Sequence, residues 1–289
     1  MRKLLLPVLA CSVIAVSVAH AAAIPIVAAE NFYGDIAKQL GGPDVTVTSI
    51  LDNPDQDPHL FEVSPSVGRN VSAARIVIYS GIDYDPWMEK LLGAARSADR
   101  QTIVVADLVG KKTGDNPHIW YDPASMLALA KTLSAALSAD DPGHKAGYEQ
   151  RLAGFEDSVK PIQAKIAELR RRWAGTRVTA TEPIFGYMFD ALGMRVGNQS
   201  FQRSVMNNTE PSASDVAAFE NDLKTRQVAL MIYNRQATDP LAERMAKIAT
   251  ASHVPVVGAT ETEPAGKNYQ SWMTSELSAV DRALSGPAP

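Results

Sequence analysis

The sequence is organised around one stretch, Asn116-Pro117-His118-Ile119-Trp120-Tyr121-Asp122-Pro123. An earlier stretch, Asp57-Pro58-His59-Leu60-Phe61-Glu62, repeats its order of proline, histidine, aliphatic and aromatic residue, with an acidic residue shortly after. Proline fixes its own φ and favours extended geometry in the preceding residue, so each histidine is expected in a stiff loop. Asn116, Asp122 and Glu62 are suited to accept the second ring N–H and fix the tautomer. We therefore predict that both histidines bind a metal ion. We favour this interpretation over a chance resemblance between two loops.

The bulk composition is that of a globular protein. The 289 residues are 46% hydrophobic and 21% charged, which leaves room for two lobes of ordinary domain size. The formal net charge is −4 at pH 7, the pI is near 5.8, and the only dense basic run, Arg170-Arg171-Arg172, is short. These values argue against a nucleic-acid partner.

The N-terminus has the pattern of a secretory signal. Arg2 and Lys3 precede an apolar run at residues 4–18, and Ala19-His20-Ala21 supplies small residues at the cleavage spacing. We therefore predict a signal peptide over residues 1–21 and a periplasmic mature chain. No later apolar run approaches the ~20 residues that span a bilayer, so the mature chain is not expected to cross the membrane.

Cys11 is the only cysteine, and it lies inside that signal. A lipid anchor at Cys11 is the alternative to cleavage after residue 21, and we consider it the less favoured one. In either case the mature chain forms no internal disulfide. After cleavage at residue 21 it also offers no thiolate ligand, so imidazole and oxygen must hold any transition metal.

Short apolar runs alternate with helical patterns in both halves of the chain, which predicts an α/β fold with mostly parallel sheets. In the first half we expect strands at 24–28, 45–50, 75–79 and 102–105, and helices at 31–41, from Pro65, at 86–95 and at 123–137. In the second half we expect strands at 177–181, 194–196, 228–233 and 254–257, helices at 184–192, 212–224 and 239–251, and a polar loop at 197–211.

Residues 142–173 differ from both halves because they are charged and space their apolar residues three or four apart. This spacing is typical of one long amphipathic helix. We therefore predict two βα lobes linked by one long rigid helix. The expected divisions are signal peptide 1–21, N-terminal lobe 22–141, linking helix 142–174 and C-terminal lobe 175–289. Both histidine loops follow strands, at the carboxyl edge where parallel sheets bind ligands.

In these features the chain resembles the periplasmic metal-receptor family of ABC importers for zinc and manganese. The likeness covers essentially the whole mature chain, and the motifs that carry it are Asp57-Pro58-His59, Pro117-His118-Ile119-Trp120, Asp122-Pro123, the long helix and Glu210-Pro211-Ser212-Ala213. The resemblance implies a metal ion between two lobes that are joined by one rigid helix, with two ligands from each lobe. It assigns the first pair to His59 and His118.

The resemblance also places the second pair of ligands. The third family ligand is a histidine in many zinc receptors and a glutamate in many manganese receptors, and here Glu182 occupies the matching stretch. Without the resemblance, Glu182 would be interpreted as an acid favoured at a helix N-terminus. The fourth ligand is usually an aspartate; this sequence departs from it with Glu261 and Glu263, of which Glu261 aligns better.

Two imidazoles, two carboxylates and a divalent cation sum to zero charge, which is the cheapest state to bury. If four protein groups close on the ion, no position remains for an activated water, so we expect no enzyme. The expected protein is a monomeric solute-binding protein that carries Zn²⁺ or Mn²⁺ as transported ligand to an ABC permease in the inner membrane. Oxygen-rich ligation favours manganese, whereas the intrinsic affinity order favours zinc.

Two other functions remain as alternatives. A secreted metal-dependent hydrolase would use both histidines and a carboxylate, but the sequence has no His-Glu-x-x-His or Gly-x-Ser-x-Gly motif. A metal-stabilised adhesin is the second alternative. Neither His144 nor His253 is expected as a ligand, and residues 233–235 and 201–203 are expected to face the cleft without an assigned role.

Overall fold

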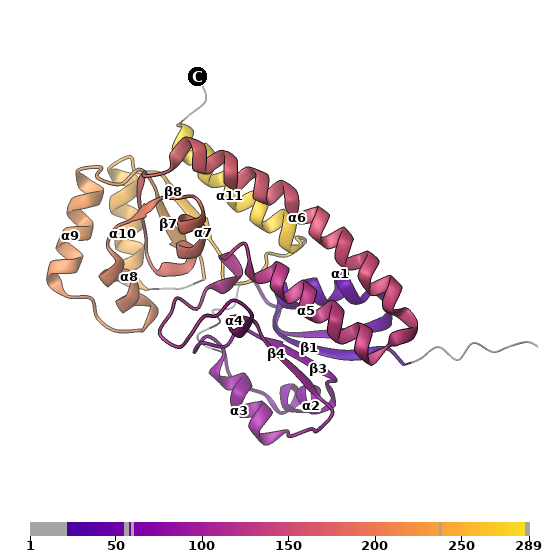
Figure 1. Cartoon of the computed structure of the whole chain (residues 1–289). Coiled ribbons are helices and arrows are strands. Elements are labelled where there is room, and N and C mark those ends of the chain that lie inside the picture. The colour runs from indigo at the N-terminus through magenta and orange to yellow at the C-terminus, as the bar shows by residue number, and fades with distance from the viewer. Residues whose placement is uncertain (1–21, 55–57, 59–60, 237–238, 287–289) are drawn as a thin grey trace, which may run out of the picture.

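Two four-stranded parallel sheets form the framework of the chain, one in each half of the sequence (Figure 1). They are seen in a computed structural model that describes residues 22–54, 58, 61–236 and 239–286. The first sheet has the order β2-β1-β3-β4 and consists of β1 (Ile24–Glu30), β2 (Val45–Leu51), β3 (Ile76–Tyr79) and β4 (Gln101–Val104). The second has the order β6-β5-β7-β8 and consists of β5 (Arg177–Ala180), β6 (Arg195–Val196), β7 (Met231–Asn234) and β8 (Val256–Ala259).

The central strands are apolar because helices cover both faces of each sheet. All four residues of β3 are buried, and Val27 of β1 pairs with Thr48 on one side and Val77 on the other. In both sheets the first strand lies between the second and the third, so the direction of winding reverses beside it. Such a switch point opens a crevice at the carboxyl ends of the strands. The two βα lobes predicted from the sequence are confirmed.

Helices follow the strands in nearly the predicted places. The first lobe contains α1 (Asn31–Gly41), α2 (Pro65–Ala73), α3 (Pro86–Ala94), α4 (Val105–Leu108) and α5 (Ser125–Asp140). The second contains α7 (Gly186–Ala191), α8 (Gln199–Met206), α9 (Ala213–Lys224) and α10 (Pro240–Ala251). Short 3-10 turns lie at η1 (Gly42–Asp44), η3 (Ile119–Tyr121), η4 (Pro142–His144) and η5 (Pro183–Phe185).

Two local predictions are wrong. The polar loop expected at 197–211 contains helix α8, whose Phe201, Gln202 and Val205 are buried, so its few apolar residues do form one packed face. Helix α5 begins at Ser125 and not at Pro123, because residues 119–121 already form the 3-10 turn η3. Just after η3, the side chain of Asp122 accepts a hydrogen bond from the N–H of Ala124 (3.0 Å).

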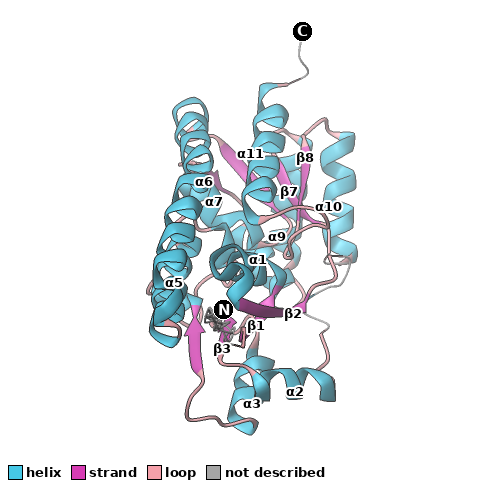
Figure 2. Cartoon of the chain, turned by 90° about the vertical axis from the view of Figure 1, so that its right-hand side faces the viewer, coloured by secondary structure: helices cyan, strands magenta, loops and turns pink. Residues whose placement is uncertain are grey.

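The long helix is α6 (Lys145–Trp173), whose 29 residues correspond to about 44 Å at 1.5 Å per residue. It packs against α1, α5 and α11 (Tyr269–Ser285), and the two long helices run side by side along the molecule (Figures 1 and 2). Asp281 of α11 forms ion pairs with Lys165 and Arg172 of α6, each at 2.7 Å. Helix α11 was not predicted, although Asn268 and Ser271 form a capping box at its start.

One hydrophobic core continues from the first sheet through α6 and α11 into the second sheet. At its middle, the ring of Tyr121 lies 4.8 Å from that of Phe185 and 5.6 Å from that of Trp272, measured between ring centroids. These rings come from the first lobe, the second lobe and the C-terminal helix. Because close-packed interiors resist deformation, this arrangement favours small displacements of the lobes over a wide hinge. Within the part of the chain that is described, every helix is too short or too polar to cross a membrane.

Candidate metal centre

Three predicted ligands meet where the two lobes face each other. His118 comes from the first lobe, and Glu182 and Glu261 come from the second; each offers a donor atom, and these atoms lie within 4.8 Å of one another. The Nε2 atom of His118 is 3.9 Å from Oε2 of Glu261. The exposed fractions of the three residues are 0%, 2% and 0%. His59, the remaining predicted ligand, lies outside the described residues.

The backbone explains why these side chains converge. Glu182 stands two residues after β5 in extended conformation (φ −151°, ψ 169°), and Glu261 stands two residues after β8. His118 directly precedes η3, and its ring lies edge-on to that of Trp120, with centroids 5.2 Å apart. The two glutamates therefore follow the carboxyl ends of second-lobe strands, and the histidine faces them from a short turn.

Asn116 fixes the orientation of His118. Its Oδ1 accepts hydrogen bonds from the backbone N–H of His118 (3.1 Å) and from Nδ1 of the ring (2.7 Å). With Nδ1 protonated, Nε2 carries the lone pair that can bind a metal ion. The other end of the Asn116 amide, Nδ2, donates to the carbonyl of Pro183 at 2.6 Å. One side chain thus connects the first-lobe ligand to the residue next to Glu182.

Asn234, at the end of β7, lies between the two glutamates and is 1% exposed. Its Nδ2 donates to Oε1 of Glu261 at 2.6 Å and also to Oε1 of Glu182. Gln236 supports the same region, because its Oε1 accepts from the backbone N–H of Glu261 at 2.6 Å. Neutral amides thereby help to position both carboxylates.

Tyr84 supplies a further contact from the first lobe. Its hydroxyl donates to Oε2 of Glu261 at 3.0 Å. Burial raises the pKa of Tyr84 well above its ordinary value, and the charges of Glu261 and Glu30 add to this effect. The hydroxyl therefore stays protonated and acts as a donor.

Two buried carboxylates this close together are costly in an apolar interior unless positive charge neutralises them. The three groups offer imidazole nitrogen and carboxylate oxygen, which are ligands typical of zinc and manganese. The cluster therefore fits a divalent cation.

The chain matches the family described as the periplasmic zinc-uptake complex component A (ZnuA) over residues 26–283. It belongs to the ZnuA family. The manganese ABC transporter substrate-binding lipoprotein PsaA of Streptococcus pneumoniae is 21% identical over 280 residues, covering 90% of this chain and 88% of PsaA. The zinc-binding lipoprotein AdcA of the same organism is 23% identical over 277 residues, covering 88% of this chain but only 54% of AdcA.

The solved structure of the periplasmic zinc-binding protein TroA from Treponema pallidum has the same fold, with a TM-score of 0.73 and 19% identity over 90% of this chain and 99% of TroA. The resemblance stated from the sequence is thus confirmed, as is the fold class. The preference for signal cleavage over a lipid anchor at Cys11 is not supported, because PsaA and AdcA are lipoproteins by name. Cys11 itself lies outside the described residues.

Within this ZnuA-family site, Glu261 rather than Glu263 joins the cluster. The backbone of Glu263 exchanges two hydrogen bonds with the side chain of Asn31, at 2.8 and 2.9 Å. Its carboxyl group borders a separate pocket of about 510 Å³ that Asp35 and Lys38 also line. Burial, together with the charge of Asp35, raises the pKa of Glu263 to about 8. Glu263 therefore lies outside the cluster, in surroundings that favour the protonated form of its carboxyl group.

The two other histidines that the structure describes, His144 and His253, lie outside the cluster. His144 is exposed and its Nδ1 pairs with Asp141 at 2.6 Å. His253 is exposed at the end of α10 with a positive φ of 58°. Of the two candidates beside His118, Asn116 holds its ring N–H, whereas Asp122 serves the turn after η3. Glu62 is exposed, and its neighbour His59 lies outside the described residues.

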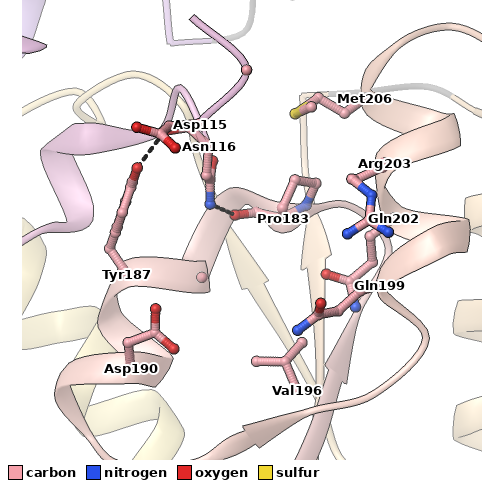
Figure 3. A pocket seen from close by; sticks show the side chains of 12 residues that line it. Asp115, Asn116, Pro183, Tyr187, Asp190, Val196, Gln199, Gln202, Arg203 and Met206 are labelled. Atoms are coloured by element: carbon pink, nitrogen blue, oxygen red, sulfur yellow. Dashed lines mark hydrogen bonds between the residues drawn. The ribbon is translucent and has the colours of Figure 1, made fainter. Parts of the chain in front are cut away.

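Residues 233–235 and 201–203, which were expected to face the cleft without an assigned role, lie in different surroundings. Asn234, from the stretch 233–235, contacts both glutamates. From the stretch 201–203, Phe201 packs in the second lobe's core, while Gln202 and Arg203 line a pocket of about 300 Å³ (Figure 3). Sequence patterns gave no sign of Tyr84 or Gln236, because a lone tyrosine or glutamine carries no spacing signal.

Asn116 connects that pocket to the candidate site, because it lines the pocket and also holds the ring of His118. In Figure 3 the Asn116 amide points to the Pro183 carbonyl, and the hydroxyl of Tyr187 reaches back toward the loop of residues 115–116. The latter bond joins Tyr187 to the carbonyl of Asn116 at 2.7 Å. None of the three clustered residues lines this pocket, so the pocket is separate from the candidate metal site.

Proposed function

We propose that this protein is an extracytoplasmic solute-binding protein that captures Zn²⁺ or Mn²⁺ between its lobes and delivers it to an ABC permease. The observation that carries the proposal is the buried cluster of one imidazole and two carboxylates, contributed by both lobes. Membership of the ZnuA family supports the proposal, as do the zinc and manganese proteins among its relatives.

The ligand set we propose is His59, His118, Glu182 and Glu261. His118 binds through Nε2 because Asn116 holds Nδ1, and each glutamate offers a carboxylate oxygen. Two neutral imidazoles and two carboxylates around a divalent cation give no net charge, so the loaded site is cheap to bury. Four protein donors leave no open position for an activated water, and we therefore propose binding without catalysis.

The proposed capture follows from the position of the ligands. The ion exchanges its water shell for donors of both lobes, so it binds most tightly when the lobes are close together. The continuous core and the paired helices α6 and α11 keep this movement small. Protons compete with the metal for both imidazoles, so binding weakens as the pH falls below neutrality.

The remaining parts of the proposal concern the cell. We propose that the mature chain works outside the cytoplasm as a monomer. Its N-terminal lobe, residues 22–141, and its C-terminal lobe, residues 175–289, are joined by the linking helix at residues 142–174. Cleavage after residue 21 and lipidation at Cys11 leave different N-termini. Mass spectrometry of the purified mature protein distinguishes them.

A competition titration tests the proposal. Demetallated mature protein is titrated with zinc and with manganese against a chromophoric chelator, alongside His118→Ala, Glu182→Ala and the control His144→Ala. We expect one tight site per chain, weakened at least ~100-fold by the first two substitutions, because each removes a ligand that binds the metal directly. The control should bind like the parent. If neither metal binds the parent, or if both site substitutions are silent, the proposal fails.

A further inference from the structure

We propose that Asn31 is a positioning residue for metal binding, because it ties the segment that carries Glu261 to the first lobe. Its role rests on the proposed function and deepens it. Glu261 lies in the connecting segment, residues 260–268, which joins β8 to α11. Asn31 is the first residue of α1, on the opposite lobe, and its side chain bonds to the backbone of Glu263.

The amide of Asn31 satisfies both polar groups of one residue in the connecting segment. Its Nδ2 donates to the carbonyl of Glu263 at 2.8 Å, and its Oδ1 accepts from the N–H of Glu263 at 2.9 Å. Phe32 and Tyr33, which follow Asn31, are fully buried in the shared core, so the amide is presented from a fixed helix end. Because Glu263 stands two positions after Glu261, this pair of bonds restricts where Glu261 can lie.

The same face of α1 continues with Asp35 and Gln39, because residues four apart are neighbours on a helix surface. Oδ2 of Asp35 accepts from the backbone N–H of Tyr269 at 3.0 Å. The side-chain amides of Gln39 and Gln270 exchange two hydrogen bonds, at 3.0 and 2.8 Å. Helix α1 therefore holds the chain after β8 at two places, close to the metal centre and again at the start of α11.

The start of the connecting segment is held from both lobes. The hydroxyl of Tyr121, in the first lobe, donates to the carbonyl of Thr260 at 2.9 Å. Oε1 of Gln236, in the second lobe, accepts from the N–H of Glu261 at 2.6 Å. Asn31 secures the side of Glu261 that leads to α11. A ligand that is already held in place loses less conformational freedom when it binds the ion, so the metal binds more tightly.

The test compares Asn31→Ala with Gln270→Ala in the full mature chain. Each substitution removes hydrogen bonds between α1 and the chain after β8, but only the first acts next to Glu261. Gln270→Ala also removes a bond to Ser158 at 2.8 Å, so the control loses at least as many hydrogen bonds. Zinc dissociation constants are measured by competition titration, and denaturant unfolding of the metal-free proteins checks that they fold.

We expect roughly 10-fold weaker zinc binding in Asn31→Ala, the low end of the range for groups that support metal ligands, and a change within ~2-fold in Gln270→Ala. If Asn31→Ala does not fold, Asn31→Asp replaces it. Aspartate can still accept from the N–H of Glu263 but cannot donate to its carbonyl. Losing that one bond should weaken zinc binding by roughly 5-fold or more.

A double-mutant cycle with Glu261→Gln separates positioning from general stability. Because Asn31 acts through Glu261, Asn31→Ala should change the zinc affinity of Glu261→Gln by no more than about 2-fold. An affinity of Asn31→Ala within about threefold of the parent would overturn the inference. So would an equally large loss in Gln270→Ala, or an equal effect of Asn31→Ala in both backgrounds. Failure of the parent to bind zinc or manganese would instead overturn the proposed function.

Discussion

Replacing Asn116 by alanine should weaken zinc binding without removing any ligand. The side chain makes two bonds that bear on the site: Oδ1 to Nδ1 of His118 at 2.7 Å and Nδ2 to the carbonyl of Pro183 at 2.6 Å. The first selects the tautomer that leaves Nε2 available. The second holds the residue beside Glu182 against the first lobe. Asn116→Ala removes both, so the ligands of the two lobes lose their shared support.

The expected loss of zinc affinity in Asn116→Ala follows from these two hydrogen bonds. A net contribution of about 1 kcal/mol for each gives about 2 kcal/mol, which corresponds to roughly 30-fold in affinity at 25 °C. This value lies inside the 10- to 100-fold range typical of groups that orient a metal-bound histidine. Because Asn116 itself does not bind the ion, the site should keep its stoichiometry of one metal per chain.

Gly186 allows an independent test of the same amide. A Cβ atom at Gly186 would lie 2.7 Å from Nδ2 of Asn116, so Gly186→Ala should displace the amide from the Pro183 carbonyl. Losing that one bond predicts roughly 5-fold weaker zinc binding. Gly154→Ala is the matched control, because an added Cβ there meets no atom within 4 Å. Alanine favours the helix over glycine, so the control Gly154→Ala should not lose stability.

The assay is zinc competition with a chromophoric chelator on the parent, the two single variants and the double variant Asn116→Ala/Gly186→Ala. The double variant should bind like Asn116→Ala alone, since the displaced bond is already absent. A zinc affinity of Asn116→Ala within about threefold of the parent would refute the reasoning, because removing a group that orients a metal-bound histidine typically weakens metal binding by roughly 10-fold or more. Additive effects of the two substitutions would refute the mechanism given for Gly186.

Three further outcomes are expected. Glu261→Gln should weaken zinc binding at least ~100-fold in the same titration, whereas Glu263→Gln should stay within ~3-fold, because only the first borders the cluster; the reverse order would reassign the fourth ligand. His59→Ala should weaken binding as much as His118→Ala, and an unchanged affinity would remove His59 from the ligand set. Burial raises the pKa of Glu276 to about 7, so its contribution to stability is full below its unfolded pKa, near 4.5, and is lost as the pH rises through 7. Glu276→Gln should therefore match the parent at pH 4 and exceed its unfolding free energy by up to about 3 kcal/mol at pH 8.5, measured by denaturant unfolding with chelator present; equal stability at pH 8.5 would contradict this.

Local patterns predicted most of the fold. Buried strands such as β3 are continuous apolar runs, and α6 shows its apolar face at the three-and-four spacing of a helix. Helix α8 was missed because its eight residues contain only two large buried apolar side chains, so the period is weak until Phe201 meets Phe219 at 4.8 Å. Tertiary packing stabilises such a helix, and the local sequence does not show that packing.

For the candidate site, the residue pattern alone pointed to the histidines, because His118 follows a proline in a stretch that resembles the one around His59. A stiff loop is a local property, so the histidines could be named from their own stretches, whereas Glu182 and Glu261 were named only through the family resemblance. Only the tertiary structure decided that Glu261 rather than Glu263 joins the cluster, and that Asn234 and Tyr84 contact its ligands. The physical reason is that these contacts join residues far apart in sequence: Tyr84 and Glu261 are separated by 177 positions, and their distance is set by how the two sheets pack across one shared core.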